Sequence, residues 1–145
     1  MNFVKTEKRA ICPTKTLFTD ACYDLYALND CVIPTVINNY STVPTATKID
    51  TGIALEIPEG YAGFIHDRSG MGFKMIKVFG GVIDFGYTQS ISVLLVNYSP
   101  ADYNVRAGDR IAQIAIQKIE NFELVEVESL SDSERGTNGF GSSGV

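Results

Sequence analysis

Apolar and polar residues alternate one by one in several short runs of this chain, and this alternation restricts the fold more than any other feature. A period of two places successive side chains on opposite faces, which is typical of a β-strand with one buried face. The runs are TGIALEIP (51–58), YAGFIH (61–66), SISVLLVN (90–97), RIAQIAIQKI (110–119) and FELVEVE (122–128). We therefore expect an all-β protein.

Turn residues separate these runs from one another. PEG at 58–60, SPAD at 99–102 and RAGD at 106–109 are typical turn sequences. The segment SGMGFKMIKVF (69–79) is compatible with a short helix, and KMIK is its best helical part. Many short strands with such turns predict a distorted jelly roll, a β-barrel-like sandwich with one short helix.

The C-terminus differs in composition from the rest of the chain. The 145 residues are enough for one domain with a substantial core, but the final segment SDSERGTNGFGSSGV is rich in Gly and Ser. We predict a β jelly-roll body over residues 1–130 and a flexible arm over 131–145. The Gly/Ser composition is typical of a simple spacer. A lid is the alternative, because Arg135 suits an anion and Phe140 suits a flat ring.

The charge and hydropathy of the chain exclude several classes of protein. A net charge of −5 argues against a nucleic-acid partner, and no apolar run approaches the roughly 20 residues that span a membrane. The first residues, MNFVKTEKRA, lack the apolar core of a signal peptide. We expect an intracellular protein, cytoplasmic or, in a eukaryotic or viral host, nuclear, with no nucleic-acid or membrane partner.

Three cysteines and a single histidine do not form a pattern for a structural zinc site. Cys12, Cys22 and Cys31 include no C-x-x-C pair, and His66 lies far from them in sequence. We expect them to be reduced, half-buried apolar side chains.

The segment GGVIDFGYTQSISV is the first of several that contain candidate functional residues. Two glycines, a strand and a tight turn over 85–88 predict a β-hairpin. Its backbone can hydrogen-bond the edge of a planar base, Tyr87 can pack under a sugar, and Asp84 can accept a proton from an attacking water. The alternative is that Asp84 only forms a local Asx turn.

The segment HDRSGMG places Arg68 and Ser69 before exposed glycines at a strand end, which suits a phosphate group. A Ser–His–Asp triad is excluded because adjacent strand residues point to opposite faces and no GxSxG surrounds Ser69. The alternative is a polar loop with an exposed arginine.

Two further segments contain polar residues in apolar surroundings. Asp24 lies within ACYDLYA, where an unpaired carboxylate is costly, so it needs a turn amide, an arginine or the water shell of a metal ion. In GDRIAQI, a local turn pairing of Asp109 with Arg110 is the simpler account, and Gln113 shares the side of Ile111 and can reach inward. No dinucleotide fingerprint or P-loop is present.

Taken in order, ACYDLYA, DRSGMG, GGVIDFGYTQS, GDRIAQI and RGTNGFGSSG resemble the five ordered motifs of the homotrimeric dUTPase family. The family forms are close to AGYDL, PRSG, GVIDxDYRG, GDRIAQ and RGxGGFGSTG. The resemblance runs from residue 21 to the C-terminus. Five motifs in the correct order are specific, whereas each one alone is weak.

The resemblance implies hydrolysis of dUTP to dUMP and pyrophosphate, with Mg²⁺ on the triphosphate. Asp84 matches the carboxylate that activates water for attack on the α-phosphorus. Tyr87 matches the ring beneath the deoxyribose that excludes a 2′-hydroxyl. The main chain of Gly81 and Val82 matches the part that reads uracil.

The remaining motifs imply the phosphate and metal contacts. The matching phosphate-binding positions are Arg68, Ser69, Gly70 and Gln113, and the matching arm positions are Arg135, Phe140, Gly141, Ser142 and Ser143. By resemblance, Asp24 and Gln113 hold Mg²⁺ through water. In the arm, the arginine grips the γ-phosphate and the aromatic ring stacks on uracil. The family is a homotrimer in which the arm crosses to a neighbour, so each site takes motifs from three chains.

The sequence departs from the family pattern at three places. Asp67 stands where the family usually has proline, which places a negative charge beside the phosphate site. Cys22 replaces a glycine, and FGYTQS replaces the common xDYRGE. These departures bear on affinity and hairpin shape.

Two other functions are compatible with these motifs. A dCTP deaminase, or a bifunctional relative, shares the fold, but its catalytic glutamate would fall at about Leu94, and the RGTNGFG arm is of the dUTPase type. A zinc deaminase is excluded because H-x-E with P-C-x-x-C is missing. A catalytically weak dUTP-binding regulatory protein is the other alternative, although a pure binder need not keep Asp84.

Overall fold

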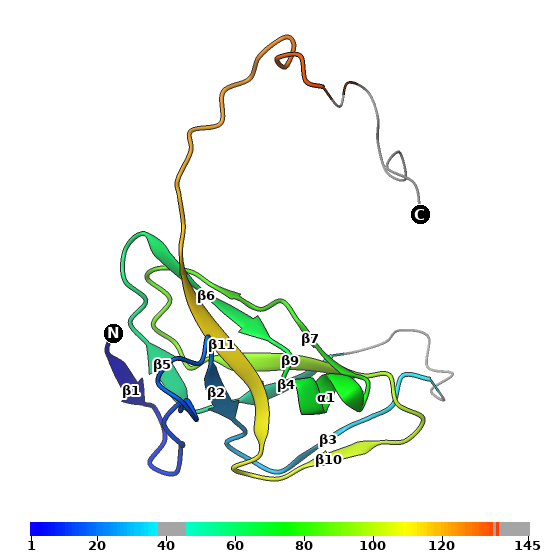
Figure 1. Cartoon of the computed structure of the whole chain (residues 1–145). Helices are drawn as coiled ribbons and strands as arrows, with labels where there is room; N and C mark the ends of the chain where they lie inside the picture. The colour runs from blue at the N-terminus through cyan, green and yellow to red at the C-terminus, as the bar shows by residue number, and fades with distance from the viewer. Residues whose placement is uncertain (38–45, 135, 137–145) are drawn as a thin grey trace.

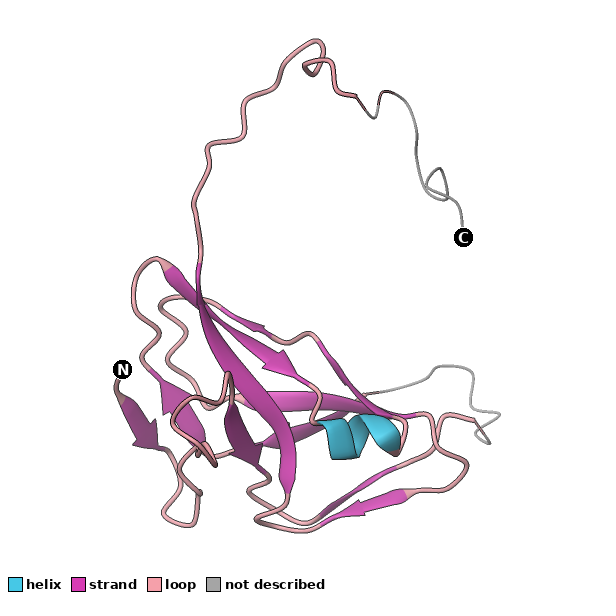
Figure 2. Ribbon diagram, viewed as in Figure 1, coloured by secondary structure: helices cyan, strands magenta, loops and turns pink. Residues whose placement is uncertain are grey.

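The chain forms a β body from which its C-terminal segment extends away (Figures 1 and 2). The computed structural model describes residues 1–37, 46–134 and 136. Within these residues the elements are β1 (Phe3–Lys5), β2 (Tyr23–Tyr26), β3 (Cys31–Ile33), β4 (Thr47–Asp50), β5 (Ile53–Leu55), β6 (Tyr61–His66), α1 (Ser69–Phe73), β7 (Ile76–Phe79), β8 (Val82–Ile83), β9 (Ser92–Asn97), β10 (Tyr103–Val105) and β11 (Arg110–Lys118). No helix among them is long and apolar enough to cross a membrane.

The strands pair into two larger sheets and two small ribbons. The strand order is β2-β11-β6-β8 in one sheet and β4-β9-β7 in the other, and the ribbons are β1-β5 and β10-β3. All strand pairs are antiparallel. The prediction of an all-β, jelly-roll-like fold with one short helix is confirmed.

Strand β11 is the centre of the four-stranded sheet and the longest strand in the described chain. It pairs with β2 on one side and β6 on the other, so Gln113 lies opposite Asp24 and opposite His66. Three segments that are distant in sequence, around residues 24, 67 and 113, therefore meet at one level of this sheet.

The apolar alternation supplies one continuous core between the sheets. Its largest fully buried side chains include Leu25, Ile53, Ile76, Leu95 and Ile111. Complete burial of such a side chain stabilises the fold by roughly 1.5–3 kcal/mol. The strands that contain these residues hold the polar segments at their ends in fixed positions.

Asn97 is a fully buried polar residue of the core, and the hydrogen bonds of its side chain are made to the backbone. Its Nδ2 donates to the carbonyl oxygens of Ile33, at 3.0 Å, and Ala101, at 2.8 Å, and its Oδ1 accepts from the amide of Ser99 at 2.9 Å. It thereby joins β3, β9 and the following turn.

We expect Asn97→Ala to lower the free energy of unfolding by about 2–4 kcal/mol, since it leaves buried backbone groups without partners. Urea denaturation at a fixed protein concentration measures this loss. Asn104→Ala, an exposed change on β10, is the matched control and should stay within about 0.5 kcal/mol of the parent. Equal stability of the two variants would contradict the role of Asn97.

The predicted helix is present but ends earlier than KMIK. Helix α1 covers Ser69–Phe73, and Met75 adopts a positive φ of 61°. Ile76 then begins β7, where it is fully buried and pairs with Asn97 of β9. The prediction that KMIK is the best helical part was wrong, because burial of Ile76 in the sheet competes with a short helical pattern.

The hairpin predicted around Asp84 is only partly formed. The amide of Tyr87 donates to the carbonyl oxygen of Asp84 at 3.2 Å, so the tight turn exists. The flanking strands do not pair with each other, because β8 pairs with β6 whereas β9 pairs with β4 and β7. The turn therefore connects the two sheets, and the prediction of a simple hairpin ladder was wrong.

The strand predicted over 122–128 is not formed in this chain. The last backbone hydrogen bond to the body runs from Ile119 to the carbonyl oxygen of Gly60 at 2.8 Å. Beyond it, Phe122 and Leu124 are 82% and 96% exposed. The alternation is real, but the described residues of this chain provide nothing to cover its apolar face. The boundary at 130 between body and arm stays a prediction.

Candidate functional site

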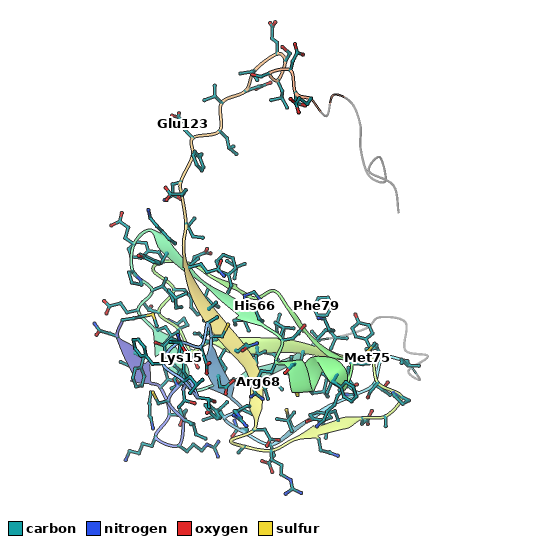
Figure 3. All side chains as sticks on the ribbon, in the orientation of Figure 1. Lys15, His66, Arg68, Met75, Phe79 and Glu123 are labelled. Atoms are coloured by element: carbon teal, nitrogen blue, oxygen red, sulfur yellow. The ribbon has the colours of Figure 1, made fainter. Side chains whose placement is uncertain are left out.

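Three of the predicted site residues line one cavity of about 380 Å³. Asp24 comes from β2, Arg68 from the turn after β6 and Gln113 from β11. The lining is completed by residues 14–16 and 20–22. In Figure 3 Arg68 lies on the body beside β11, whereas Glu123 lies on the extension, away from the body.

Asp24 is held by two arginines. Its Oδ1 accepts from Nε of Arg68 at 2.7 Å, and its Oδ2 lies 3.4 Å from Nη1 of Arg110. The Asp24 side chain is only 13% exposed, so a strong ionic partner is needed there. Arginine was one of the partners expected from the sequence. The local Asp109–Arg110 pairing was wrong, since Asp109 instead accepts the amide of Arg106 at 2.9 Å.

The main chain and Nε of Arg68 are held by hydrogen bonds, whereas its terminal guanidinium nitrogens are not. Its carbonyl oxygen accepts the amides of Met71 and Gly72, both at 2.9 Å, and its Nε donates to Asp24. Its terminal guanidinium nitrogens make no hydrogen bond to any other described residue. A positioned guanidinium with its fork free can bind an anionic oxygen pair.

Gln113 holds the turn that contains Arg68. Its Nε2 donates to the carbonyl oxygen of Asp67 at 2.7 Å, which confirms that this side chain reaches inward from β11. Its amide oxygen remains available to the cavity.

Ser69 and Gly70 follow Arg68 and are both exposed. A Cβ built on Gly70 would meet no atom within 4 Å, and its φ is not in the left-handed region. Nothing within the described chain requires a glycine at this position. Without a side chain, Gly70 leaves its main-chain atoms accessible to a bound ligand.

Asp84 and Tyr87 lie on the turn after β8 and do not line the cavity of Arg68. Asp84 is exposed, and its carboxylate makes no hydrogen bond or ion pair within the described part of the chain. The alternative Asx turn is therefore not formed. Tyr87 is 40% exposed and donates from its hydroxyl to the carbonyl oxygen of Ser90 at 3.3 Å.

Gly81 and Val82 form the outer edge of the four-stranded sheet. The carbonyl oxygen of Gly81 accepts the amide of Ile65 at 2.7 Å, and a Cβ there would lie 2.7 Å from the oxygen of Ile65. Only glycine permits this close approach. Because hydrogen-bonded residues alternate along an antiparallel pair, the main-chain groups of Val82 point away from β6. They are free to bind the edge of a planar ligand.

Five predicted residues lie outside the described residues, namely Arg135, Phe140, Gly141, Ser142 and Ser143.

No group of three or more His, Cys, Asp or Glu side chains capable of holding a metal ion occurs among the described residues. Two acidic residues line the cavity, Asp24 and Asp20, and Oδ2 of Asp20 already accepts the amide of Leu17 at 2.8 Å. Mg²⁺ commonly keeps several waters and uses one or two carboxylates together with the phosphates of a ligand. The residues present fit an ion of that kind, held through water.

The sequence did not indicate the loop that completes the cavity. Lys15 lies 4.5 Å from the ring centre of Tyr23 and donates to the carbonyl oxygen of Asp20. Cys22 lines the cavity; burial raises the pKa of its thiol, while Lys15 partly offsets the rise. No spacing rule links this loop to Arg68, and only the pairing of Thr14 with Asp24 brings them together.

The three cysteines are free and half-buried, as expected. Burial raises the pKa of Cys31, and the neighbouring Asp30 raises it further. The thiols of Cys22 and Cys31 are therefore protonated at neutral pH.

Comparison with known proteins identifies consistent relatives. A model of the dUTPase family matches residues 8–144. The probable deoxyuridine 5'-triphosphate nucleotidohydrolase of Schizosaccharomyces pombe is 41% identical over 142 residues, which are 97% of this chain and 96% of that protein. The dUTPase of Staphylococcus bacteriophage 80alpha, solved with dUPNHPP, is 30% identical with a TM-score of 0.88, and 99% of this chain and 98% of that chain are covered. A mutant dUTPase from phage phi11 of S. aureus, solved to describe coordination of a structural Mg(II) ion, is 25% identical with a TM-score of 0.77, covering 88% of this chain and 96% of that chain.

Proposed function

This chain belongs to the dUTPase family, and from that premise we propose that it hydrolyses dUTP to dUMP and pyrophosphate with Asp84 activating the attacking water. Its enzyme class is that of a dUTP diphosphatase. The observation that carries the proposal is the family match over residues 8–144. Within it, the carboxylate of Asp84 and the terminal guanidinium nitrogens of Arg68 have no partner among the described residues.

The cavity of Arg68 is proposed to bind the triphosphate. Asp24 orients the guanidinium through Nε and leaves its fork open, which suits bidentate contact with phosphate oxygens. Ser69 supplies a hydroxyl and Gly70 leaves room for a phosphate to approach the main chain. Gln113 lines the same cavity.

Asp84 is proposed as the general base. Its exposed carboxylate has no partner among the described residues, so it is free to accept a proton. In the reaction, the water oxygen attacks the α-phosphorus while its proton passes to Asp84. The bond from the α-phosphorus to the bridging oxygen breaks, and pyrophosphate leaves.

The base and the sugar are proposed to be read beside Asp84. The unpaired main chain of Val82 at the edge of β8 supports recognition of the uracil edge, next to Gly81. Tyr87 presents an exposed ring on the same turn, which suits packing beneath a deoxyribose and exclusion of a 2′-hydroxyl.

We propose that a complete site forms only in a homotrimer. Asp84 and Tyr87 do not line the cavity that contains Arg68 in their own chain, so a neighbouring chain would have to supply them. The uncovered apolar side chains of Phe122 and Leu124 support association, since such a surface is normally covered. The arm, with Arg135 and Phe140, is proposed to close each site from a further chain.

Mg²⁺ is proposed to arrive with the triphosphate and to neutralise part of its charge. Asp24 and Gln113, which both line the cavity, would contact its water shell. The phi11 relative coordinates a structural Mg(II) ion. An intracellular location is also proposed, because deoxynucleoside triphosphates are intracellular compounds.

The test is ³¹P NMR of the purified protein with Mg²⁺ and, in turn, dUTP, dCTP, dTTP and UTP. We expect monophosphate and pyrophosphate from dUTP alone, because the main chain beside Val82 selects the base and Tyr87 selects the sugar. Release of monophosphate and pyrophosphate from dCTP instead would favour the bifunctional deaminase relative despite Leu94. Binding of dUTP without hydrolysis would favour a regulatory protein, with the altered FGYTQS turn as the cause.

A further inference from the structure

The carboxylate of Asp67 does not face the cavity but connects the turn before α1 to strand β7. Its Oδ1 accepts the main-chain amide of Val78 at 2.6 Å, and its Oδ2 pairs with Nζ of Lys77. The Asp67 side chain is 23% exposed. The negative charge that the sequence places beside the phosphate site is therefore already paired elsewhere.

This contact joins the two larger sheets. Asp67 directly follows β6 of the four-stranded sheet, whereas Val78 lies on β7, an edge strand of the three-stranded sheet. The amide of an alternate residue on an edge strand points away from the sheet and needs a partner. Asp67 supplies that partner, so one side chain fixes the spacing between β6 and β7.

The main chain of the same residue is also fixed. The carbonyl oxygen of Asp67 accepts Nε2 of Gln113 at 2.7 Å, and the next side chain, Arg68, donates from Nε to Asp24 at 2.7 Å. The side chain of Asp67 is thus bound to β7, and its main-chain carbonyl group is bound to β11. The Cα of Arg68 has little freedom to move relative to the cavity.

We propose that Asp67 is a positioning residue, whose bond to β7 holds Arg68 in the orientation that binds the phosphates of the substrate. A proline, usual in the family at this place, restrains the backbone through its ring. Asp67 provides a comparable restraint through a tertiary hydrogen bond. The inference rests on the proposed function, because it requires Arg68 to contact phosphate.

The hydrogen bond from the Val78 amide to Asp67 contributes more to the positioning of Arg68 than the ion pair with Lys77 does. Lys77 is 51% exposed, and exposed ion pairs contribute little. A hydrogen bond from a main-chain amide to a half-buried carboxylate is charge-assisted and stronger. Removing Lys77 alone should therefore matter much less than removing Asp67.

The test measures dissociation constants of the full-length protein for dUPNHPP and for deoxyuridine, which has no phosphate. Asp67→Ala should weaken dUPNHPP binding about 10-fold and leave deoxyuridine binding unchanged. Asp67→Asn keeps an acceptor for Val78 and, like Lys77→Met, should stay within about 3-fold of the parent. Asp67→Pro should restore most of the affinity lost in Asp67→Ala.

A double-mutant comparison shows whether Asp67 acts through Arg68. In an Arg68→Met background, Asp67→Ala should have no further effect on dUPNHPP binding. An equal effect in both backgrounds, or equal weakening for deoxyuridine, would overturn the positioning role. Failure of the parent protein itself to bind dUPNHPP would instead overturn the proposed function and this inference with it.

Discussion

Asp84→Asn is expected to lower the turnover of dUTP by about 10²-fold or more while leaving its binding nearly unchanged. Asparagine has the shape of aspartate but cannot accept the proton of an attacking water. The side chain is exposed and has no partner among the described residues, so the change should not disturb the fold. Single-turnover rates and the affinity for dUPNHPP separate the chemical step from binding.

The matched control for this change is Glu59→Gln, which removes one negative charge from an exposed turn of the body. It should have the turnover of the parent. Unchanged turnover in Asp84→Asn would refute Asp84 as the base. Equal loss of binding and turnover would assign it to substrate binding.

Deletion of residues 135–145 is expected to leave a folded protein with the assembly state of the parent that has lost about 10²-fold in activity, comparable to the loss of a transition-state donor elsewhere. The reason is that Arg135 and Phe140 are proposed to close the site over the γ-phosphate and the base. Among the described residues the last backbone hydrogen bond to the body is that of Ile119, well before the deletion, so we expect the body to fold without the arm. Light scattering and urea denaturation verify assembly and stability, and full activity would refute the lid.

Mixing two inactive variants tests whether the site is shared between chains. Asp84→Asn and the 135–145 deletion are refolded together so that mixed trimers form. If one chain supplies Asp84 and another supplies the arm, some sites in mixed trimers are complete and activity returns. A site built within one chain would give no activity above that of the separate variants.

The body of the fold was predictable from the sequence where burial repeats over several residues. The run YAGFIH matches β6, and RIAQIAIQKI matches β11 to within one residue, because each strand has alternating faces with distinct surroundings. KMIK was misassigned because a four-residue run fits both a helix and a strand. Burial of Ile76 against β9 decides between them.

The alternation in FELVEVE predicts a strand without identifying the strand that pairs with it. It indicates that one face of the segment has to be covered, but not which chain covers it. Phe122 and Leu124 stay exposed in the described structure, so the pattern is consistent with a strand that forms only against a partner.

For the candidate site the sequence indicated individual residues but not their arrangement. The sequence placed a carboxylate at Asp24 in need of a partner, yet an amide, an arginine and a metal all satisfied that requirement. The register of β2 and β6 on β11 brings Arg68 to it. Likewise, the direction of Asp67 depends on the spacing between two sheets, which no local pattern contains.

Because the surroundings of Gly70 are open, selection for folding and selection for enzyme activity should give different results at this position. A side chain added there would meet no atom of the described chain, so a library sorted only for folded protein would retain many residues at this position. A library sorted for growth that depends on the enzyme would keep glycine if a phosphate approaches the main chain there. Tolerance in the first and intolerance in the second marks a residue maintained for its ligand and not for its fold.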